Sequence, residues 1–189
     1  MAQTALITGA SNGIGLELAK IHAKQGGDLV LVARSTDKLN ALADELHKYG
    51  VKVAVIAKDL AQPNAGTEIF AETERLGITV DILINNAGIG GHGCFFERDL
   101  TKDMQMIQLN ITSLTELTHL YLQGMIERRS GKILNVSSTA SFLPGPLQAV
   151  YYASKAYVTS FSQAIAEEVR EFGITVTVLC PGAVATGFV

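Results

Sequence analysis

Short apolar segments alternate with longer amphipathic segments along the whole chain. The apolar segments are rich in β-branched residues and have little polar alternation, which is typical of strands buried on both faces of a parallel sheet. We expect strands at residues 4–8, 29–33, 51–57, 82–85, 133–137 and 174–180. The segments between them carry apolar residues at helical spacing and predict helices at residues 14–24, 36–48, 66–76, 101–128 and 151–172.

The ends of the predicted helices support the same order of elements. Thr36 and Thr101 are expected to cap helix starts, and Gly50 and Gly173 are expected to end helices. Strands that alternate with helices predict an α/β fold of the doubly wound Rossmann type, with a mostly parallel sheet flanked by helices on both faces. Residues 1–189 are expected to form one domain, because no internal boundary, low-complexity tract or repeat interrupts the pattern.

Composition narrows the class of protein. Hydrophobic residues make up 48% of the 189 residues and charged residues 17%, with a formal net charge of −3, as in an ordinary globular chain. No block of Lys or Arg suggests nucleic acid or an anionic membrane as a partner. Neither a signal peptide nor an apolar run of the about 18 residues of a membrane helix is evident, so we expect the protein in the cytoplasm.

The cysteines give no indication of a metal site or a disulfide. Cys94 and Cys180 lie in segments of different character, which makes neither a disulfide framework nor a cysteine-ligated metal an expected feature. His92 is close to Cys94, but we interpret it as a histidine of a flexible loop. No metal is expected.

A glycine-rich turn follows the first predicted strand and opens the first predicted helix. Its sequence is Thr8-Gly9-Ala10-Ser11-Asn12-Gly13-Ile14-Gly15. Gly9 would allow a sharp turn, Gly13 the approach of the backbone to a pyrophosphate, and Gly15 close packing of helix on sheet. The N–H groups and positive dipole end of the helix would face the phosphates. Glycines also collect in purely structural turns, but this position between strand and helix predicts a dinucleotide site.

The residue after the second predicted strand bears on which dinucleotide binds. An acidic side chain there would bind the adenine-ribose 2′-hydroxyl of NAD, whereas Arg34 offers a guanidinium group to a 2′-phosphate. A solvated arginine after a strand is the alternative interpretation. We expect NADP(H), with NAD(H) as the less favoured cofactor.

A tyrosine and a lysine four residues apart provide candidate acid–base chemistry. Tyr151 and Lys155 would lie one turn apart on the same face of a helix. A phenol has a pKa of about 10, which a neighbouring ammonium lowers toward neutrality, so that Tyr151 can act as general acid or base. Ser138 lies at the carboxyl end of the fifth strand, where open α/β sheets bind their ligands. Tyr152 is the rival tyrosine, but Lys155 is only three residues from it.

Three more motifs follow predicted strands: Asp59-Leu60, Asn85-Asn86-Ala87-Gly88, and Pro181-Gly182-Ala183-Val184-Ala185-Thr186. Together with the glycine-rich turn, Asn110, Asn135-Val136-Ser137-Ser138 and the Tyr151/Lys155 pair, they resemble the motifs of the short-chain dehydrogenase/reductase family in its single-domain branch. The resemblance runs along essentially the whole chain.

The resemblance implies a mechanism and a set of contacts. Ser138 would position the substrate oxygen, Tyr151 would transfer the proton, and Lys155 would lower the pKa of the tyrosine and contact the nicotinamide ribose. Asn110 would hold a water beside Lys155. Contacts to the cofactor are expected from Gly9, Ser11, Asn12, Gly13, Ile14, Gly15, Arg34, Asp59, Leu60, Asn86, Ala87, Gly88, Tyr151, Lys155, Pro181, Gly182, Val184 and Thr186.

The resemblance also implies features outside the site. Members of the family continue into a substrate-covering lid and a final strand that this sequence lacks, so we expect a truncated chain in which residues 174–180 form an unpaired sheet edge. It further implies a homodimer or homotetramer, formed through the helices at residues 101–128 and 151–172.

The substrate and the exact activity stay open at this point. Apolar residues at 90–96 and 139–147 indicate a bulky hydrophobic carbonyl or alcohol, or else residues of a core or interface. An NADP(H)-dependent oxidoreductase is favoured, because a pure binding module needs none of the four candidate catalytic residues. The alternatives are a non-catalytic NADP-binding or scaffold protein and a sugar-nucleotide epimerase or dehydratase.

Overall fold

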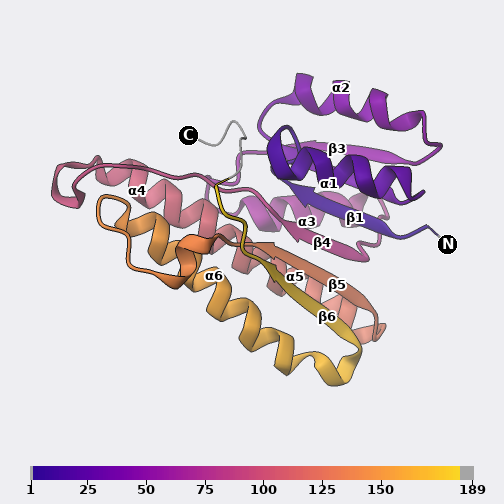
Figure 1. Ribbon diagram of the computed structural model, residues 1–189. Coiled ribbons are helices and arrows are strands. Elements are labelled where there is room, and N and C mark those ends of the chain that lie inside the picture. The colour runs from indigo at the N-terminus through magenta and orange to yellow at the C-terminus, as the bar shows by residue number, and fades with distance from the viewer. Residues whose placement is uncertain (1, 184–189) are drawn as a thin grey trace.

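A computed structural model describes residues 2–183 and contains one parallel sheet of six strands (Figure 1). The strands are β1 (Thr4–Thr8), β2 (Asp28–Ala33), β3 (Val53–Ala57), β4 (Ile82–Asn85), β5 (Gly131–Val136) and β6 (Ile174–Leu179). They lie in the order β3-β2-β1-β4-β5-β6, and every neighbouring pair is parallel. The predicted doubly wound sheet is therefore confirmed.

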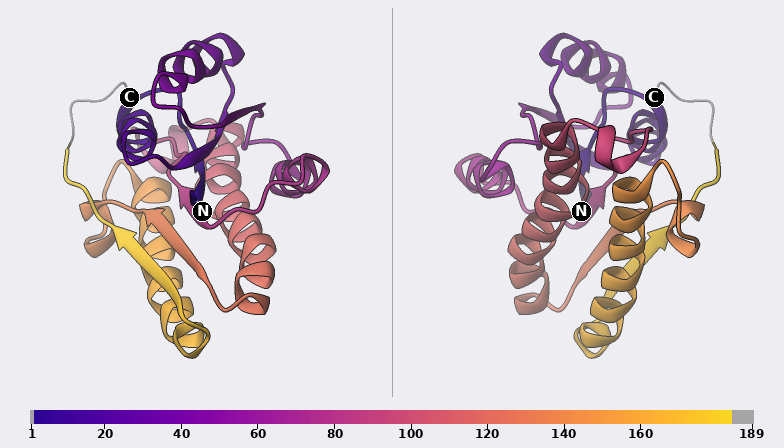
Figure 2. Two further views of the ribbon diagram at one scale, coloured as in Figure 1. Left: turned by 90° about the vertical axis from the view of Figure 1, so that its right-hand side faces the viewer. Right: turned by 90° about the vertical axis from the view of Figure 1, so that its left-hand side faces the viewer.

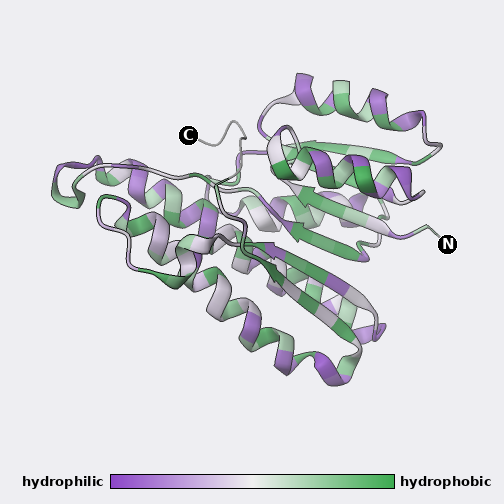
Figure 3. Cartoon of the chain, in the orientation of Figure 1, coloured by the Kyte–Doolittle hydropathy of each residue, from purple (hydrophilic) through white to green (hydrophobic). Residues whose placement is uncertain are grey.

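Helices cover both faces of this sheet (Figure 2). They are α1 (Gly13–Lys24), α2 (Thr36–His47), α3 (Ala65–Arg75), α4 (Leu100–Ile107), α5 (Leu114–Glu127) and α6 (Ala149–Glu168). Successive strand residues point to opposite faces, so Ile7 packs in the core under α1 and α2, while Leu6 packs in the core under α3 and α5. The strands are apolar along most of their length because both faces are covered (Figure 3).

The predicted helix at residues 101–128 is divided into three parts in the structure. Between α4 and α5 lies η2 (Gln108–Ser113), a turn with π-helical hydrogen bonding. Two side chains of η2 bond to distant backbone: Asn110 to Ile89, and Ser113 Oγ to the carbonyl of Leu60 at 2.6 Å. These tertiary bonds account for a local change in winding that the hydrophobic spacing does not show.

Two of the predicted caps are off by one or two residues. Ser35, not Thr36, is the N-cap residue of α2, and Asp99, not Thr101, is the N-cap residue of α4. The Asp99 carboxylate accepts a hydrogen bond from the Thr101 N–H at 2.9 Å. Gly50 and Gly173 have φ of 72° and 75° and follow helical segments, as predicted. The α6 segment ends in a short 3₁₀ turn, η4 (Arg170–Phe172).

Helix α3 has an unusual cap. Asn64 at its N-cap position makes no side-chain capping bond. Instead the carboxylate of Glu116, from α5, accepts hydrogen bonds from the Gly66 N–H at 3.2 Å and the Thr67 N–H at 3.0 Å. A negative charge at the N-terminus of a helix stabilises it, because the helix dipole has its positive pole there. The two helices are thus joined by charge as well as by apolar packing.

Within residues 2–183, β6 is one of the two edge strands of the sheet, as expected from the sequence, and β3 is the other. Ile174 is buried, but Thr175, Thr177 and Leu179 are exposed along one face of the strand. The opposite face carries Val176 and Val178, which are half-buried against α6.

Candidate functional site

A cavity of about 580 Å³ opens at the carboxyl ends of the strands. The segments that line it follow all six strands, and its centre lies between β1 and β4, where the direction of strand addition reverses. Open α/β sheets bind ligands at this position, because the loops diverge there. The volume falls within the range of small-molecule and cofactor sites.

The glycine-rich turn forms one wall of the cavity and can hold only glycine at two positions. Gly9 has φ of 66°, and a β-carbon on it would lie 2.8 Å from Nδ2 of Asn86. A β-carbon on Gly15 would lie 2.4 Å from the carbonyl oxygen of Gly9. Asn12, at the N-cap of α1, makes no side-chain capping bond. The turn therefore leaves room and N–H donors at a helix N-terminus, which suits the pyrophosphate of a dinucleotide.

Thr8 links the turn to the loop after β4. Its Oγ1 accepts hydrogen bonds from the backbone N–H groups of Asn86 and Ala87, both at 3.0 Å. In return, Nδ2 of Asn86 donates to the Thr8 carbonyl at 2.9 Å. These bonds hold the exits of β1 and β4 together at the floor of the cavity.

Cationic side chains gather where the cavity meets the ends of β2 and β3. Arg34, Lys38 and Lys58 line this part together with Asp59. Lys58 also forms an ion pair with Glu68, and Asp59 accepts a hydrogen bond from the Ala61 N–H at 3.0 Å. Three cations at one end of the cavity favour a ligand with additional negative charge there.

Lys155 lies at the other end of the cavity in a nearly closed environment. It is 5% exposed, and its Nζ donates to the carbonyl of Val136 at 3.0 Å. Its Nζ lies 5.9 Å from the centre of the Tyr151 ring. Burial lowers the pKa of Lys155 to about 8, with a smaller opposing effect from Cys180. The amine is therefore mostly protonated at neutral pH and close to the phenol.

The two adjacent tyrosines have different neighbours. Tyr151 lies in the first turn of α6, on the same helical face as Lys155. The ring of Tyr152 instead packs on Gly145, where a β-carbon would lie 2.3 Å from the ring. Tyr152 thus packs against the segment that precedes α6.

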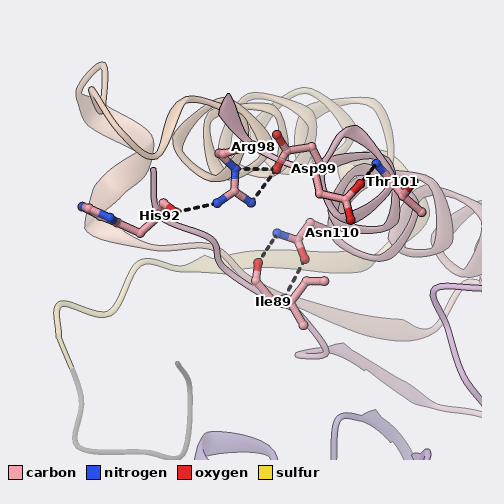
Figure 4. A network of polar contacts seen from close by, with 7 residues as sticks. Ile89, His92, Arg98, Asp99, Thr101 and Asn110 are labelled. Atoms are coloured by element: carbon pink, nitrogen blue, oxygen red, sulfur yellow. Dashed lines mark hydrogen bonds and ion pairs between the residues drawn. The ribbon is translucent and has the colours of Figure 1, made fainter. Parts of the chain in front are cut away.

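Asn110 joins the loop after β4 to the helix that carries Tyr151. Figure 4 shows its side chain facing the backbone of Ile89. Its Oδ1 accepts from the Ile89 N–H at 3.0 Å, and its Nδ2 donates to the Ile89 carbonyl at 2.9 Å and to Ser154 Oγ at 3.0 Å. Ser154 Oγ in turn donates to the Tyr151 carbonyl at 2.7 Å. A β-carbon on Gly88 would lie 3.3 Å from Asn110 Oδ1 and 3.4 Å from Lys155 Nζ, so Gly88 passes between these two side chains.

Ser137 and Ser138 follow β5 and have different roles in the local structure. Ser137 is buried, and its Oγ donates to the Lys155 carbonyl at 2.9 Å, which fixes α6 against the strand. Ser138 lines the cavity, and its Oγ accepts from the Ala140 N–H at 3.1 Å at the start of η3 (Thr139–Phe142). The hydroxyl of Ser138 thus lies in the same cavity as the amine of Lys155.

Comparison with known proteins identifies the family. The family model described as short chain dehydrogenase matches residues 3–189. The human very-long-chain 3-oxoacyl-CoA reductase is 38% identical over 98% of this chain, and mouse 17-beta-hydroxysteroid dehydrogenase type 3 is 36% identical over 98%. The chain covers 61% of the length of each of these relatives.

The protein belongs to the short-chain dehydrogenase family.

Solved structures of the same family have the same fold. A short-chain dehydrogenase from Sphingobium yanoikuyae in complex with NADPH matches with a TM-score of 0.92 and 37% identity, over 97% of this chain and 72% of that one. The bulky-bulky ketone specific alcohol dehydrogenase from Comamonas testosteroni matches with a TM-score of 0.91 and 35% identity, over 96% and 73%.

The cavity of this short-chain dehydrogenase brings together most residues singled out from the sequence. Those lining it are Gly9, Ser11, Asn12, Gly13, Ile14, Arg34, Asp59, Leu60, Asn86, Ala87, Gly88, Ser138, Lys155, Pro181 and Gly182. Gly15, Asn110 and Tyr151 are outside that lining but contact it or pack behind it. Val184 and Thr186 lie outside the described residues.

Sequence reasoning missed several residues at the site. Lys38 and Lys58 line the cavity, and Ser137 and Ser154 fix the residues that do. Lys38 lies in the first turn of α2, four positions after Arg34 in the sequence, and this closeness could have indicated it. The two serines gave no such signal, because their partners depend on how α6 packs.

The described part of this short-chain dehydrogenase offers neither a membrane-spanning helix nor a cluster of metal ligands. In residues 2–183, no helix is both long and apolar enough to cross a membrane. Over the same range, no three His, Cys, Asp or Glu side chains are grouped so that they could hold a metal ion.

Proposed function

We propose that the protein is an NADP(H)-dependent oxidoreductase that interconverts a carbonyl and an alcohol by hydride transfer. Belonging to the short-chain dehydrogenase family supports an oxidoreductase acting on CH–OH groups. The observation that carries the proposal is the position of the Lys155 amine, 5.9 Å from the centre of the Tyr151 ring, at one end of a cavity that fits a dinucleotide.

The walls of the cavity suit NADP(H) along its length. The turn at Gly9 to Gly15 would hold the pyrophosphate, since a β-carbon at either glycine would meet neighbouring atoms. Arg34, with Lys38 and Lys58, would bind the 2′-phosphate, and Asp59 the adenine end. The Sphingobium yanoikuyae structure is one of a relative in complex with NADPH. When bound, the nicotinamide supplies or accepts the hydride.

The proton is handled by the protein's own side chains. In carbonyl reduction, Tyr151 donates its phenolic proton to the substrate oxygen as hydride reaches the carbon, and in alcohol oxidation it accepts that proton. Lys155 Nζ, 5.9 Å from the centre of the Tyr151 ring, would place a positive charge beside the group that transfers the proton. Ser138 Oγ would hold the substrate oxygen in place by a hydrogen bond.

Asn110 has a positioning role in this arrangement. Its side chain is engaged by Ile89 and Ser154, so it holds the loop after β4 against the helix that carries Tyr151. The role of holding a water beside Lys155, which the family resemblance implies, stays part of the proposal.

We propose a bulky apolar substrate. Phe96 is 84% exposed, and Phe142 and Leu143 are 65% and 67% exposed, so these side chains do not belong to a core. They lie on the two segments next to the site, and the Gly93 N–H joins these segments through a 2.8 Å hydrogen bond to the Leu147 carbonyl. The names of the reductase and ketone-specific relatives agree with a bulky carbonyl substrate.

The proposal is tested by measuring the consumption of NADPH and, in parallel, of NADH. The substrates are a panel of bulky ketones, small ketones and 3-oxoacyl thioesters. We expect turnover of bulky ketones or thioesters with preference for NADPH. Preference for NADH would contradict the role of Arg34. Binding of NADPH without turnover of any compound would instead support the non-catalytic NADP-binding alternative.

The assembly and location are part of the same proposal. We propose a homodimer or homotetramer formed through α5 and α6, on which the partly exposed Tyr157 stacks on Phe161 at 5.5 Å. The cytoplasm stays the predicted location, and fractionation of cells that express the protein tests it.

A further inference from the structure

Arg98 makes three hydrogen bonds that the proposed reaction does not use. Its Nε and Nη2 donate to Oδ1 of Asp103 at 2.9 and 2.6 Å, and its Nη1 donates to the carbonyl of His92 at 2.8 Å (Figure 4). Asp103, on α4, is only 2% exposed, and the Arg98 side chain is 15% exposed. The pair therefore fixes a loop to a helix, with the carboxylate buried and the guanidinium partly exposed.

The loop in question, residues 86–99 between β4 and α4, folds around the guanidinium group. A β-carbon on Gly91 would lie 2.2 Å from Nη2 of Arg98, so the group occupies the space that this glycine leaves. Gly93 has φ of 136°, a conformation that side chains disfavour. The path of the loop is thus specified by glycines on one side and by Arg98 on the other.

The 86–99 loop connects directly to the candidate site at both ends. Near β4, Ile89 lines the cavity, and its N–H and carbonyl groups both hydrogen-bond to the Asn110 side chain. Further along, the Gly93 N–H donates to the carbonyl of Leu147, two residues before α6 begins and four before Tyr151. The loop and the segment before α6 therefore form one continuous wall beside Tyr151.

Stability alone gives a weak reason for such a pair. Burying the Asp103 carboxylate costs much of what its attraction to Arg98 returns, so a partly buried ion pair of this kind serves geometry more than net stability. Here the geometry that it fixes is that of a wall carrying exposed aromatic side chains, Phe95 and Phe96. A small displacement of such a wall changes how a substrate is placed against the reacting groups.

We infer that Arg98, held by Asp103, is a positioning residue that sets the affinity of the site for bulky apolar substrates. The inference rests on the proposed function, since it assigns the 86–99 loop as the wall that contacts the carbon skeleton of the carbonyl compound. It concerns substrate binding and leaves the binding of the dinucleotide unaffected, because Arg98 and Asp103 lie outside the cavity lining.

The test compares Arg98→Met, which keeps an unbranched side chain but removes all donors, with Arg128→Met as a matched control. Arg128 also donates to a backbone carbonyl, that of Val80 at 2.6 Å, but at the amino end of β4, away from the cavity. In R98M we expect the KM for a bulky ketone to rise about tenfold. The kcat for that ketone and the KM for a small ketone should change less. The Kd for NADPH should stay within about twofold of the wild-type value. R128M should change none of these.

Two milder variants test the same pair if R98M folds poorly. Arg98→Lys keeps a cation beside Asp103 but cannot reproduce the three bonds, and Asp103→Asn removes the carboxylate while keeping the shape. Both should raise KM in the same direction. An unchanged KM in variants that fold, or a parallel loss of NADPH binding and stability, would overturn the inference.

Amide hydrogen exchange separates this inference from the proposed function. If the wild type binds NADPH but turns over no ketone, the proposed function fails. Exchange of residues 89–98 then decides whether Arg98 fixes the loop: it should be faster in R98M than in wild type and R128M. Equal exchange in all three proteins would contradict the positioning role.

Discussion

Lys155 shows how strongly one environment changes the chemistry of a side chain. Its Nζ has the Val136 carbonyl and the Tyr151 ring as neighbours, and burial brings its pKa to about 8. A cation in this position destabilises the folded protein, because burial disfavours the charged form of the amine. Residues that are costly to the fold in this way are typical of functional sites.

Replacing Lys155 should change how stability depends on pH. The folded-state pKa of about 8 lies below the ordinary 10.5, so between these values the unfolded chain holds a proton that the folded protein has lost. The free energy of unfolding of the wild type should therefore rise with pH across this window, by up to roughly 3 kcal/mol. Lys155→Met lacks this titration, and its stability should rise less. Urea unfolding of both proteins at pH 7 and at about pH 10 measures the difference. Parallel curves would contradict the burial of a charged amine.

Tyr151→Phe and Tyr152→Phe separate the two adjacent tyrosines. Loss of the Tyr151 hydroxyl removes the proton donor, so kcat should fall about 10²–10⁴-fold, while NADPH still binds. Tyr152→Phe keeps the ring that packs on Gly145 and should retain most of the activity. Steady-state kinetics and NADPH titration of both variants provide the comparison. Equal losses in the two variants would exclude Tyr151 as the specific acid–base group.

At the scale of elements, the turn η2 positions more of the site than its length suggests. It places Asn110 against Ile89 and Ser154, and Ser113 against the Leu60 carbonyl. The loop after β4 and the start of α6 are thereby held to the same point of the α4–α5 segment. A regular helix at residues 101–128 would leave these side chains out of register.

Asn110→Ala should destabilise the protein more than Ser113→Ala does. The asparagine bonds to both backbone groups of Ile89 and to Ser154 Oγ, so its replacement removes three hydrogen bonds, each worth about 1 kcal/mol. The serine variant loses two hydrogen bonds, the one that Ser113 Oγ donates to the Leu60 carbonyl and the longer one, at 3.3 Å, that it accepts from Gln108 Nε2. Thermal unfolding of the two variants, with hydrogen exchange at Ile89, measures both effects. A smaller loss in N110A than in S113A would show that the asparagine does not hold the loop.

The same elements show what the sequence predicts and what it cannot. The six strands were predictable because each is a short run rich in apolar, β-branched residues, and their alternation with helices along the chain implies parallel pairing. The division of residues 101–128 was not, since it depends on bonds from Asn110 and Ser113 to residues far away in the chain. The Arg98–Asp103 ion pair could not be predicted for the same reason. It depends on how the loop that contains Gly91 packs around the Arg98 guanidinium.

At the scale of the whole molecule, the described residues leave two surfaces with different characters. One is the face of β6 that carries Thr175, Thr177 and Leu179. The other lies on α5 and α6, where Tyr157 bonds to Thr115 at 2.9 Å and stacks on Phe161. The second surface joins two helices that each support the site, so an interface there would stiffen the site as well.

Phe161→Arg should convert the proposed oligomer into monomers. A charge at the centre of an apolar interface loses its hydration without gaining a partner, which costs several kcal/mol of association. Sedimentation at micromolar concentration measures the change, and circular dichroism checks that the monomer is folded. Ile21→Arg, at a 51% exposed apolar residue on α1, is the control and should leave the assembly intact. A wild-type protein that sediments as a monomer would contradict this part of the proposal.

The carboxylate of Glu116 at the N-terminus of α3 has a consequence for synthesis on the ribosome. The two N–H groups that it caps belong to Gly66 and Thr67, about fifty positions earlier in the nascent chain. The first turn of α3 therefore receives its anionic cap only after α5 has been translated and has docked beside it. Until that moment, the N-terminal half of the growing polypeptide holds an incompletely capped helix. The two helices consequently reach their final stability together, as one late cooperative unit.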